Sequence, residues 1–299
     1  MQYLFHTARI MPVQNEAYRL KNIEVAVLRL DEMHPVISGN KWFKLKAYLT
    51  DAAQQQKKAI LTFGGAYSNH IVATAAACAK AGFLSIGIIR GEAPKTLSPT
   101  LADAQQYGMQ LHFISREAYR QKAVPPEAYG VLKKSDVYRI SEGGYGEKGM
   151  EGSMDILKSV AVENYTHIIA AVGTGTMLAG LIKATAPQQQ VIGISVLKNN
   201  FGAADAVAQL AHIPAENIQI LHDYAFGGYA RHTPELLQFM NNWYAATGIP
   251  SDFVYTAKTF YAADELIQKG VFQVGSSLLV IHSGGLQGNR SLPAGTLRF

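Results

Sequence analysis

The sequence has little cysteine and few charged residues. Of its 299 residues only Cys78 is a cysteine, so no disulfide bond can form within the chain, and a reducing compartment is the default expectation. Charged residues make up 16% of the chain and hydrophobic residues 48%, which excludes an intrinsically disordered protein. The formal net charge is +5, but no run of basic residues occurs, and we expect no nucleic-acid partner.

Long apolar segments and metal-binding patterns are also absent. No apolar run approaches the ~20 residues of a transmembrane helix, and the N-terminal residues have no basic flank before a long apolar core. We therefore expect no membrane partner, no signal peptide and a cytoplasmic location. The nine histidines are scattered, and neither a His-Glu-x-x-His motif nor a pair of cysteines occurs, so we expect no metal site. The nucleophile motif Gly-x-Ser-x-Gly is missing as well.

Short apolar runs alternate with longer helical ones along the chain. The segment Ile23–Leu30 (IEVAVLRL) is typical of a strand, and the segment that starts at Asn40 (NKWFKLKAYLTDAAQQQ) has a helical composition. Further on, Gly82 can close a helix, and Ser98 followed by Pro99 can start one. The alternation predicts an α/β fold with parallel sheets flanked by helices. At this length we expect two lobes rather than one.

Three glycine-rich turns directly follow predicted strands: FGGAYSNH, AVGTGTMLAG and IHSGGLQGN. In open α/β sheets ligands bind at the carboxyl ends of the strands, and helix N-termini present free N–H groups to anions. The turn Val172–Thr176 therefore indicates a phosphate-binding loop with hydroxyl groups from Thr174 and Thr176. It lacks the lysine that ends a P-loop and the glycine spacing of dinucleotide enzymes. A tight turn without any ligand is the alternative interpretation.

The segment SGNKWFKL places Lys41 beside Trp42 and Phe43, which is an unusually apolar setting for a lysine. Burial lowers the pKa of a lysine, so that more of the amine is neutral and able to react with an aldehyde. Together with a phosphate-binding loop and several hydroxyl groups, this setting suits pyridoxal phosphate. From the segment alone, a lysine that starts a helix and reaches toward solvent is the simpler interpretation.

These motifs together resemble those of the 1-aminocyclopropane-1-carboxylate deaminase/D-cysteine desulfhydrase family. Its members bind pyridoxal 5'-phosphate and have the two-lobed fold type II, which is similar to the tryptophan synthase β subunit. The resemblance extends from about Arg29 to Leu286 and rests on SGNKWFKL, FGGAYSNH, SEGGYGEKGMEG, VGTGTMLAG, SDFVYTAK and IHSGG. It implies a small lobe over residues 47–150 and a large lobe formed by residues 1–46 and 151–299. It also implies a homodimer.

The resemblance further implies roles for single residues. Lys41 would form the Schiff base with the cofactor, and Asn69 would bind the oxygen on its pyridine ring. The phosphate would be held by Gly173, Thr174, Gly175, Thr176 and Met177, with Lys44 as a charge partner. Ser68 would contact the substrate carboxylate or act in proton transfer. Tyr229 and Tyr255 would be catalytic residues that face the substrate from the other lobe.

Two positions bear on the substrate. Thr256 and Ser283 fall where the family contacts or borders the pyridine nitrogen and the substrate. The cyclopropane deaminases typically have Glu and Leu there, whereas the desulfhydrases have hydroxyl residues, so this sequence is more similar to the desulfhydrases. The implied function is a lyase acting on a small amino acid, with D-cysteine converted to pyruvate, sulfide and ammonia. A 1-aminocyclopropane-1-carboxylate deaminase and a non-catalytic protein that binds pyridoxal phosphate are the alternatives.

Two features depart from the family's pattern. Phe43 stands where the family usually has arginine or a similar polar residue, and the segment before SGNK is shorter than in the usual member by a helix or two.

Overall fold

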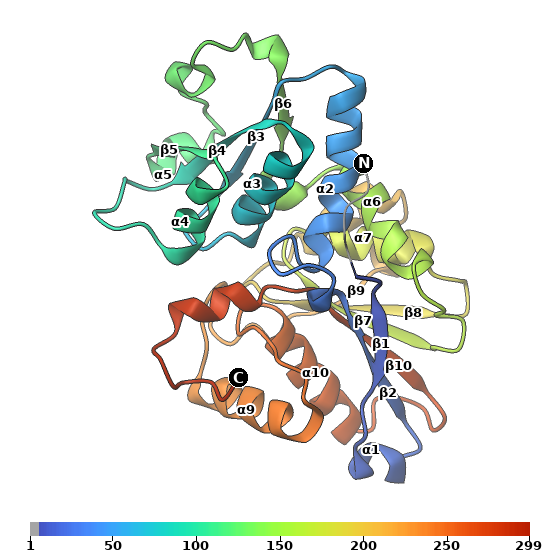
Figure 1. The fold of residues 1–299 in the computed structure, drawn as a ribbon. Coiled ribbons are helices and arrows are strands. Elements are labelled where there is room, and N and C mark those ends of the chain that lie inside the picture. The colour runs from blue at the N-terminus through green and yellow to red at the C-terminus, as the bar shows by residue number, and fades with distance from the viewer. Residues whose placement is uncertain (1–5) are drawn as a thin grey trace.

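The computed structural model describes residues 6–299, which form two sheets flanked by helices (Figure 1). One sheet has four strands in the order β5-β4-β3-β6, and the other has six in the order β1-β2-β10-β7-β8-β9. The strands are β1 Arg9–Pro12, β2 Glu24–Arg29, β3 Ala59–Gly64, β4 Leu84–Arg90, β5 Gln110–Ile114, β6 Val137–Ile140, β7 His167–Val172, β8 Gln190–Ser195, β9 Gln219–Leu221 and β10 Ser277–His282. Within residues 6–299 all neighbouring strands are parallel except β1 and β2, which confirms the predicted α/β fold.

The helices begin and end largely where local sequence signals place them. They are α1 Glu16–Leu20, α2 Asn40–Gln54, α3 Asn69–Ala81, α4 Pro99–Gln106, α5 Arg116–Arg120, α6 Glu147–Lys158, α7 Thr176–Ala184, α8 Ala203–Ala211, α9 Pro234–Thr247 and α10 Thr256–Gln268. The Ser98 hydroxyl accepts the N–H of Leu101 at 3.2 Å, directly before Pro99. Gly82 ends α3 in the left-handed conformation, with φ of 78°. Both predicted helix boundaries are confirmed.

The six-stranded sheet is buried on both faces. On one face Val25 and Val27 of β2 pack in a core with Phe260 of α10 and residues of α9. On the other face the alternate residues Ala26 and Leu28 pack in a core with residues of α6 and α7. Because successive side chains of a strand point to opposite faces, a strand covered on both sides must be apolar throughout. This explains the nearly unbroken apolar run at residues 23–30.

Helix α2 links the two sheets. Phe43 packs in the core beneath the six-stranded sheet, whereas Leu45 and Tyr48 pack with Ile60 of β3 beside the four-stranded sheet. Cys78 of α3 is fully buried in that second core. The predicted lobe bounds, 47–150 against 1–46 and 151–299, stay a prediction, and residues 1–5 of the large lobe lie outside the described residues.

The sequence did not reveal the shortest elements. Strands β1, β6 and β9 and helices α1 and α5 were not predicted, because three to five residues are too few for a hydrophobic period to show. In residues 6–299 no helix has the length and apolar character needed to cross a membrane. The same part of the chain contains no cluster of metal-ligating side chains. The predicted absence of a signal peptide concerns the N-terminal end, whose residues 1–5 are outside the described part.

Candidate functional site

A cavity of about 730 Å³ lies where strands of both sheets end. Its walls include the turns that follow β3, β7 and β10 and the first residues of α2. Carboxyl ends of parallel strands are the usual place for a ligand in such sheets. The predicted site residues that line the cavity are Lys41, Lys44, Ser68, Asn69, Gly173, Thr174, Gly175, Met177, Tyr229, Tyr255 and Ser283. The structure thus brings together segments from both halves of the chain.

Two predicted residues, Thr176 and Thr256, do not line the cavity. Thr176 is fully buried, and its hydroxyl lies 3.1 Å from the hydroxyl of Thr174. The Thr256 hydroxyl donates to the buried carboxylate of Asp252 at 2.7 Å. Because that hydroxyl is already bound, the structure gives no support to a contact between it and a cofactor ring.

The first and last of the six motifs meet at the backbone. The N–H of Asn40 donates to the carbonyl of Ser283 at 3.2 Å. Gly39, with φ of 66°, passes so close that a Cβ at this position would lie 1.9 Å from the same carbonyl oxygen. Only glycine allows both the positive φ and this approach. The contact explains why a glycine precedes the lysine, and it holds the start of α2 against the turn after β10.

Lys41, the second residue of α2, lies at the centre of the site. Its Nζ donates to Asn40 Oδ1 at 2.7 Å and lies 5.9 Å from the ring centroid of Tyr255. Burial lowers the pKa of Lys41 to about 8, and the nearby carboxylate of Asp252 partly opposes this shift. A substantial fraction of the amine is therefore neutral near pH 7.5. The burial comes from the cavity walls, since Phe43 points into the core beneath.

A second buried lysine lies beside Lys41. Lys44 is 4% exposed, and its Nζ donates to the carbonyl of Gly143 at 3.3 Å. Burial, with a further contribution from Lys41, lowers the pKa of Lys44 well below its usual value. Among residues 6–299 no carboxylate forms an ion pair with it. A buried ammonium without a counterion is costly, so this position favours a bound anion.

The predicted phosphate loop lies close to that ammonium. Gly173–Gly175 joins β7 to α7, and Gly175 adopts φ of 80° directly before the helix. Gly143, which binds Lys44, lies against this loop, because a Cβ on Gly143 would be 3.0 Å from Cγ2 of Thr174. The first N–H groups of α7 have no partner within the helix and carry its positive dipole. Loop, helix terminus and lysine together fit the phosphate of pyridoxal phosphate.

The turn after β3 supplies open polar atoms. Ser68 caps α3, although its hydroxyl accepts the N–H of Ile71 at a long 3.4 Å. Within residues 6–299 the buried atoms Asn69 Oδ1 and His70 Nδ1 have no hydrogen-bond partner, and both residues line the cavity. Burial lowers the pKa of His70 well below its usual value, so the ring is neutral. Buried polar atoms without partners are rare, and these two acceptors fit a ligand that presents N–H or O–H groups. The side-chain nitrogen of Asn69 is the group that can donate to a ring oxygen of the cofactor.

Tyr229 and Tyr255 also line the cavity and lie side by side. Their ring centroids are 6.1 Å apart with an interplanar angle of 71°. Burial raises the pKa of both, that of Tyr255 well above its ordinary value, while Tyr255 partly lowers the pKa of Tyr229 in return. Both phenols therefore stay protonated near neutral pH. Each can donate a proton inside the cavity, Tyr229 more readily.

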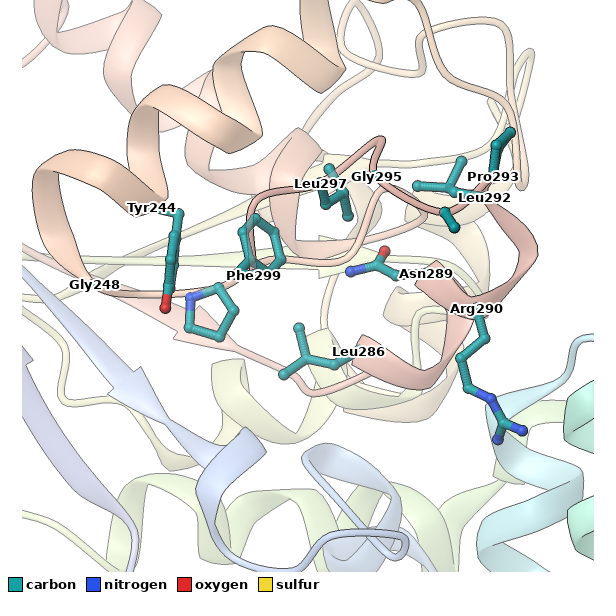
Figure 2. Close-up of a pocket in the computed structure, with 12 residues that line it drawn as sticks. Tyr244, Gly248, Leu286, Asn289, Arg290, Leu292, Pro293, Gly295, Leu297 and Phe299 are labelled. Carbon is teal, nitrogen blue, oxygen red and sulfur yellow. The ribbon is translucent and has the colours of Figure 1, made fainter.

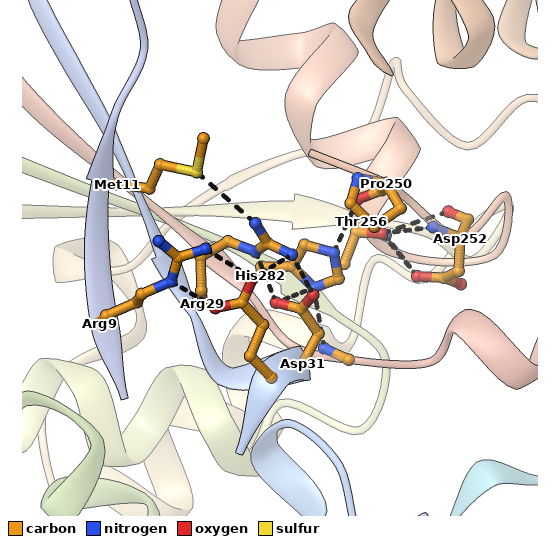
Figure 3. A network of polar contacts seen from close by, with 10 residues as sticks. Arg9, Met11, Arg29, Asp31, Pro250, Asp252, Thr256 and His282 are labelled. Carbon is orange, nitrogen blue, oxygen red and sulfur yellow. Dashed lines mark hydrogen bonds and ion pairs between the residues drawn. The ribbon is translucent and has the colours of Figure 1, made fainter. Parts of the chain in front are cut away.

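A buried polar network fixes the turn that contains Ser283 (Figure 3). Arg29 binds Asp31 at 2.7 Å, and Nδ1 of His282 lies 3.4 Å from Asp31. His282 Nε2 donates to the carbonyl of Pro250 at 2.8 Å, while Nδ1 accepts the N–H of Gly284. Burial lowers the pKa of His282, and a neutral ring satisfies both of these bonds. The network therefore holds the backbone around Ser283 in one conformation.

Several lining residues were missed by the sequence reasoning. Arg90, Arg116 and Glu142 also face the cavity. Arg90 is the last residue of β4, and a charged residue at the carboxyl end of a buried strand was a signal that could have found it. Asp252, which raises the pKa of Lys41 and binds the first N–H groups of α10, had no local signal beyond its motif.

A second cavity of about 650 Å³ lies between α9 and the C-terminal residues (Figure 2). Tyr244, Leu286, Leu297 and Phe299 contribute much of its apolar wall, and Asn289 and Arg290 its polar part. It includes none of the predicted site residues, and we assign no chemistry to it.

Comparison with known proteins agrees with this geometry. The family described as "Pyridoxal-phosphate dependent enzyme" matches residues 12–284. A mitochondrial bifunctional D-cysteine desulfhydrase/1-aminocyclopropane-1-carboxylate deaminase from Arabidopsis thaliana is 28% identical over 295 residues, 89% of this chain and 73% of that protein. A 1-aminocyclopropane-1-carboxylate deaminase from Rhizobium rhizogenes is 25% identical over 281 residues, 83% of this chain and 82% of that protein. A crystal structure of an ACC deaminase homologue superposes with a TM-score of 0.81 at 27% identity, covering 97% and 92% of the two chains.

Proposed function

This chain belongs to the family of pyridoxal-phosphate dependent enzymes and, within it, to the deaminase and desulfhydrase type of lyase, and from that premise we propose that it converts D-cysteine to pyruvate, sulfide and ammonia. The predicted family, fold type II and cofactor, pyridoxal 5'-phosphate, are confirmed. The choice of D-cysteine is the finer step, and it is our proposal.

The observation that supports elimination is the position of Lys41. Its partly neutral amine lies in a cavity whose other polar groups are mainly hydroxyls and amides, with Tyr255 close by. A neutral amine can take up a proton, and a phenol that is protonated at neutral pH can give one. The arrangement therefore pairs a base with acids around one enclosed volume.

The residues of this chain divide the work as follows. Bound pyridoxal phosphate supplies the aldehyde that combines with an amino group and the ring that takes up electrons from Cα. The residues that would hold the cofactor are Lys41, Lys44, Asn69 and the loop Gly173–Gly175. The Lys41 amine removes the proton from Cα of the substrate. A phenol donates a proton to the departing sulfur, and Tyr229 is the better donor because its pKa is less raised than that of Tyr255.

The substrate carboxylate is bound at the start of α3. Ser68 lines the cavity there, and the first N–H groups of the helix favour an anion. Arg90 adds a positive charge beside this turn, since its guanidinium lies 3.5 Å from where a Cβ on Gly65 would be. Ser283 supports a desulfhydrase over a cyclopropane deaminase, because its small hydroxyl side chain lines the cavity where the deaminases typically have Leu.

Paired product assays test the proposal. The purified protein, loaded with pyridoxal phosphate, is expected to release sulfide and pyruvate from D-cysteine faster than from L-cysteine. Release of 2-oxobutanoate from 1-aminocyclopropane-1-carboxylate, without sulfide from D-cysteine, would instead establish the second candidate. That candidate is favoured by the names of the Rhizobium relative and of the crystallised homologue.

A Ser283→Leu variant separates the two candidates further. It fills the cavity where the deaminases have Leu, and we expect it to lower sulfide release while the bound cofactor keeps its absorbance. Absence of turnover with both substrates would leave the non-catalytic alternative. The homodimer and the cytoplasmic location stay predictions.

A further inference from the structure

A fully buried lysine outside the cavity has no place in the chemistry above. Lys258 lies in the first turn of α10 and is 0% exposed. Within residues 6–299 no carboxylate forms an ion pair with it. A buried ammonium costs folding free energy unless its protons are bound, and an apolar side chain of similar length would avoid that cost. Its presence at this position therefore indicates a specific role for the charged group.

Three backbone carbonyls bind the ammonium. Lys258 Nζ donates to the carbonyls of Gly228 at 2.7 Å and Ala225 at 2.8 Å, and lies 3.4 Å from the carbonyl of Val196. Val196 directly follows β8, while the other two belong to the segment between β9 and α9. A single charged group thus connects α10, the end of β8 and this segment.

The segment has an unfavourable backbone that needs such support. Positive φ angles occur at Phe226, Gly227, Gly228 and Ala230, with values of 46°, 88°, 113° and 53°. Non-glycine residues rarely adopt this conformation, and it persists only where surrounding contacts impose it. In this conformation the carbonyls of Ala225 and Gly228 face Lys258. Each carbonyl accepts one backbone N–H in addition to the bond from the lysine.

Tyr229 directly follows one of these carbonyls. It lines the cavity and keeps 41% of its surface exposed. Its partner Tyr255 stands three residues before Lys258, at the start of the same helix. The lysine consequently ties the backbone of one tyrosine to the helical turn that positions the other.

We propose that Lys258 is a positioning residue, whose ammonium holds residues 225–228 by their carbonyl oxygens and so fixes where Tyr229 enters the cavity. Its effect on turnover rests on the proposed function, whereas its effect on the backbone does not. The tether uses the charge of the lysine, because charge-assisted hydrogen bonds are about twice as strong as neutral ones.

Hydrogen exchange followed by mass spectrometry tests the tether without any turnover. Lys258→Met keeps the length of the side chain and removes its donors. In the protein loaded with pyridoxal phosphate, we expect amides of residues 225–231 to exchange about tenfold or more faster, while those of β10 are unchanged. Lys269→Met is the matched control, because Lys269 stands at the exposed end of the same helix and pairs with Glu265. Equal loosening of β10, or no change at residues 225–231, would overturn the proposal.

Chemical rescue provides a second readout. Lys258→Ala leaves a space beside three carbonyls, and ammonium chloride is expected to restore slow exchange at residues 225–231, whereas tetramethylammonium chloride is too large to do so. A Lys258→Ala protein that does not fold even with ammonium present would mean that the lysine serves stability alone, and the proposal would be wrong. If D-cysteine is a substrate, Lys258→Met should lower kcat at unchanged affinity for pyridoxal phosphate. A wild-type protein inactive on D-cysteine would refute the substrate while the exchange result still decides the tether.

Discussion

The lowered pKa of Lys41 predicts how fast the protein without cofactor combines with pyridoxal phosphate. The ratio of neutral to charged amine rises tenfold per pH unit below the pKa. With a pKa of about 8, roughly one quarter of Lys41 amines are neutral at about pH 7.5, against roughly one in a thousand at the ordinary value of 10.5. Only the neutral amine reacts with an aldehyde, so burial accelerates the reaction by about two orders of magnitude at this pH.

The assay follows the cofactor's absorbance after rapid mixing, between about pH 6 and pH 10. We expect the bimolecular rate constant to rise with pH and to level off near pH 8. Nα-acetyl-lysine serves as the reference, and its reaction should keep accelerating through the whole range. A rate for the protein that likewise keeps rising up to pH 10 would refute the burial of this amine.

An Asp252→Asn variant sharpens the test. The carboxylate of Asp252 raises the pKa of Lys41 against the effect of burial. Asparagine keeps an oxygen that can accept the N–H groups at the start of α10. Removal of the charge should move the plateau to lower pH, and an unchanged plateau would show that the two groups do not interact.

Further predictions concern anion binding, the substrate and the backbone. Lys44→Met should make the protein without cofactor more stable to heat, because a buried charge is removed. The same variant should bind pyridoxal phosphate roughly 10–100-fold more weakly in equilibrium titration. Lower stability and unchanged affinity would contradict this. Ser68→Ala should lower the free energy of unfolding by only about 0.5–1 kcal/mol, since the capping hydrogen bond of Ser68 is long. It should, however, lower kcat/KM by tenfold or more. The control Asn15→Ala, which removes the cap of another helix, should lower stability alone. Gly39→Ala should abolish cofactor binding, because the new Cβ clashes with the Ser283 carbonyl. Gly82→Ala is the control: open space surrounds Gly82, so this variant loses only the stability that a positive φ costs, about 1 kcal/mol. Equal losses of stability in the two variants would refute the clash.

The sequence predicted most of the fold because its signals are local. Alternation of buried strands and helices, the cap at Ser98 and the helix end at Gly82 all depend on neighbouring residues. All but two of the site residues predicted from the motifs line the cavity. The motifs do not specify the distance in space between residues that are far apart in the sequence. The close approach of Gly39 to Ser283 is therefore seen only in the structure.

The contacts that escaped prediction depend on tertiary structure. Lys258 belongs to the SDFVYTAK motif, but the sequence of this motif does not indicate that the carbonyls of residues 196, 225 and 228 surround the amine. Thr256 illustrates the opposite case. Its place in the motif implied a position that contacts or borders the pyridine nitrogen and the substrate. In the structure its hydroxyl donates to Asp252, a residue four positions earlier. A side chain's partner depends on which neighbours fold against it, which a pattern of residue types does not specify.

The attachment of the cofactor to Lys41 is tested most directly by reducing the loaded protein with borohydride and locating the modified lysine by peptide mass spectrometry. The account predicts that the added pyridoxyl phosphate mass falls on Lys41 in the wild-type protein and is absent from Lys41→Ala. Its finding on Lys44 or on Lys258, whose pKa is also lowered to about 8 by burial, or an unmodified Lys41 in protein that has bound the cofactor, would contradict it.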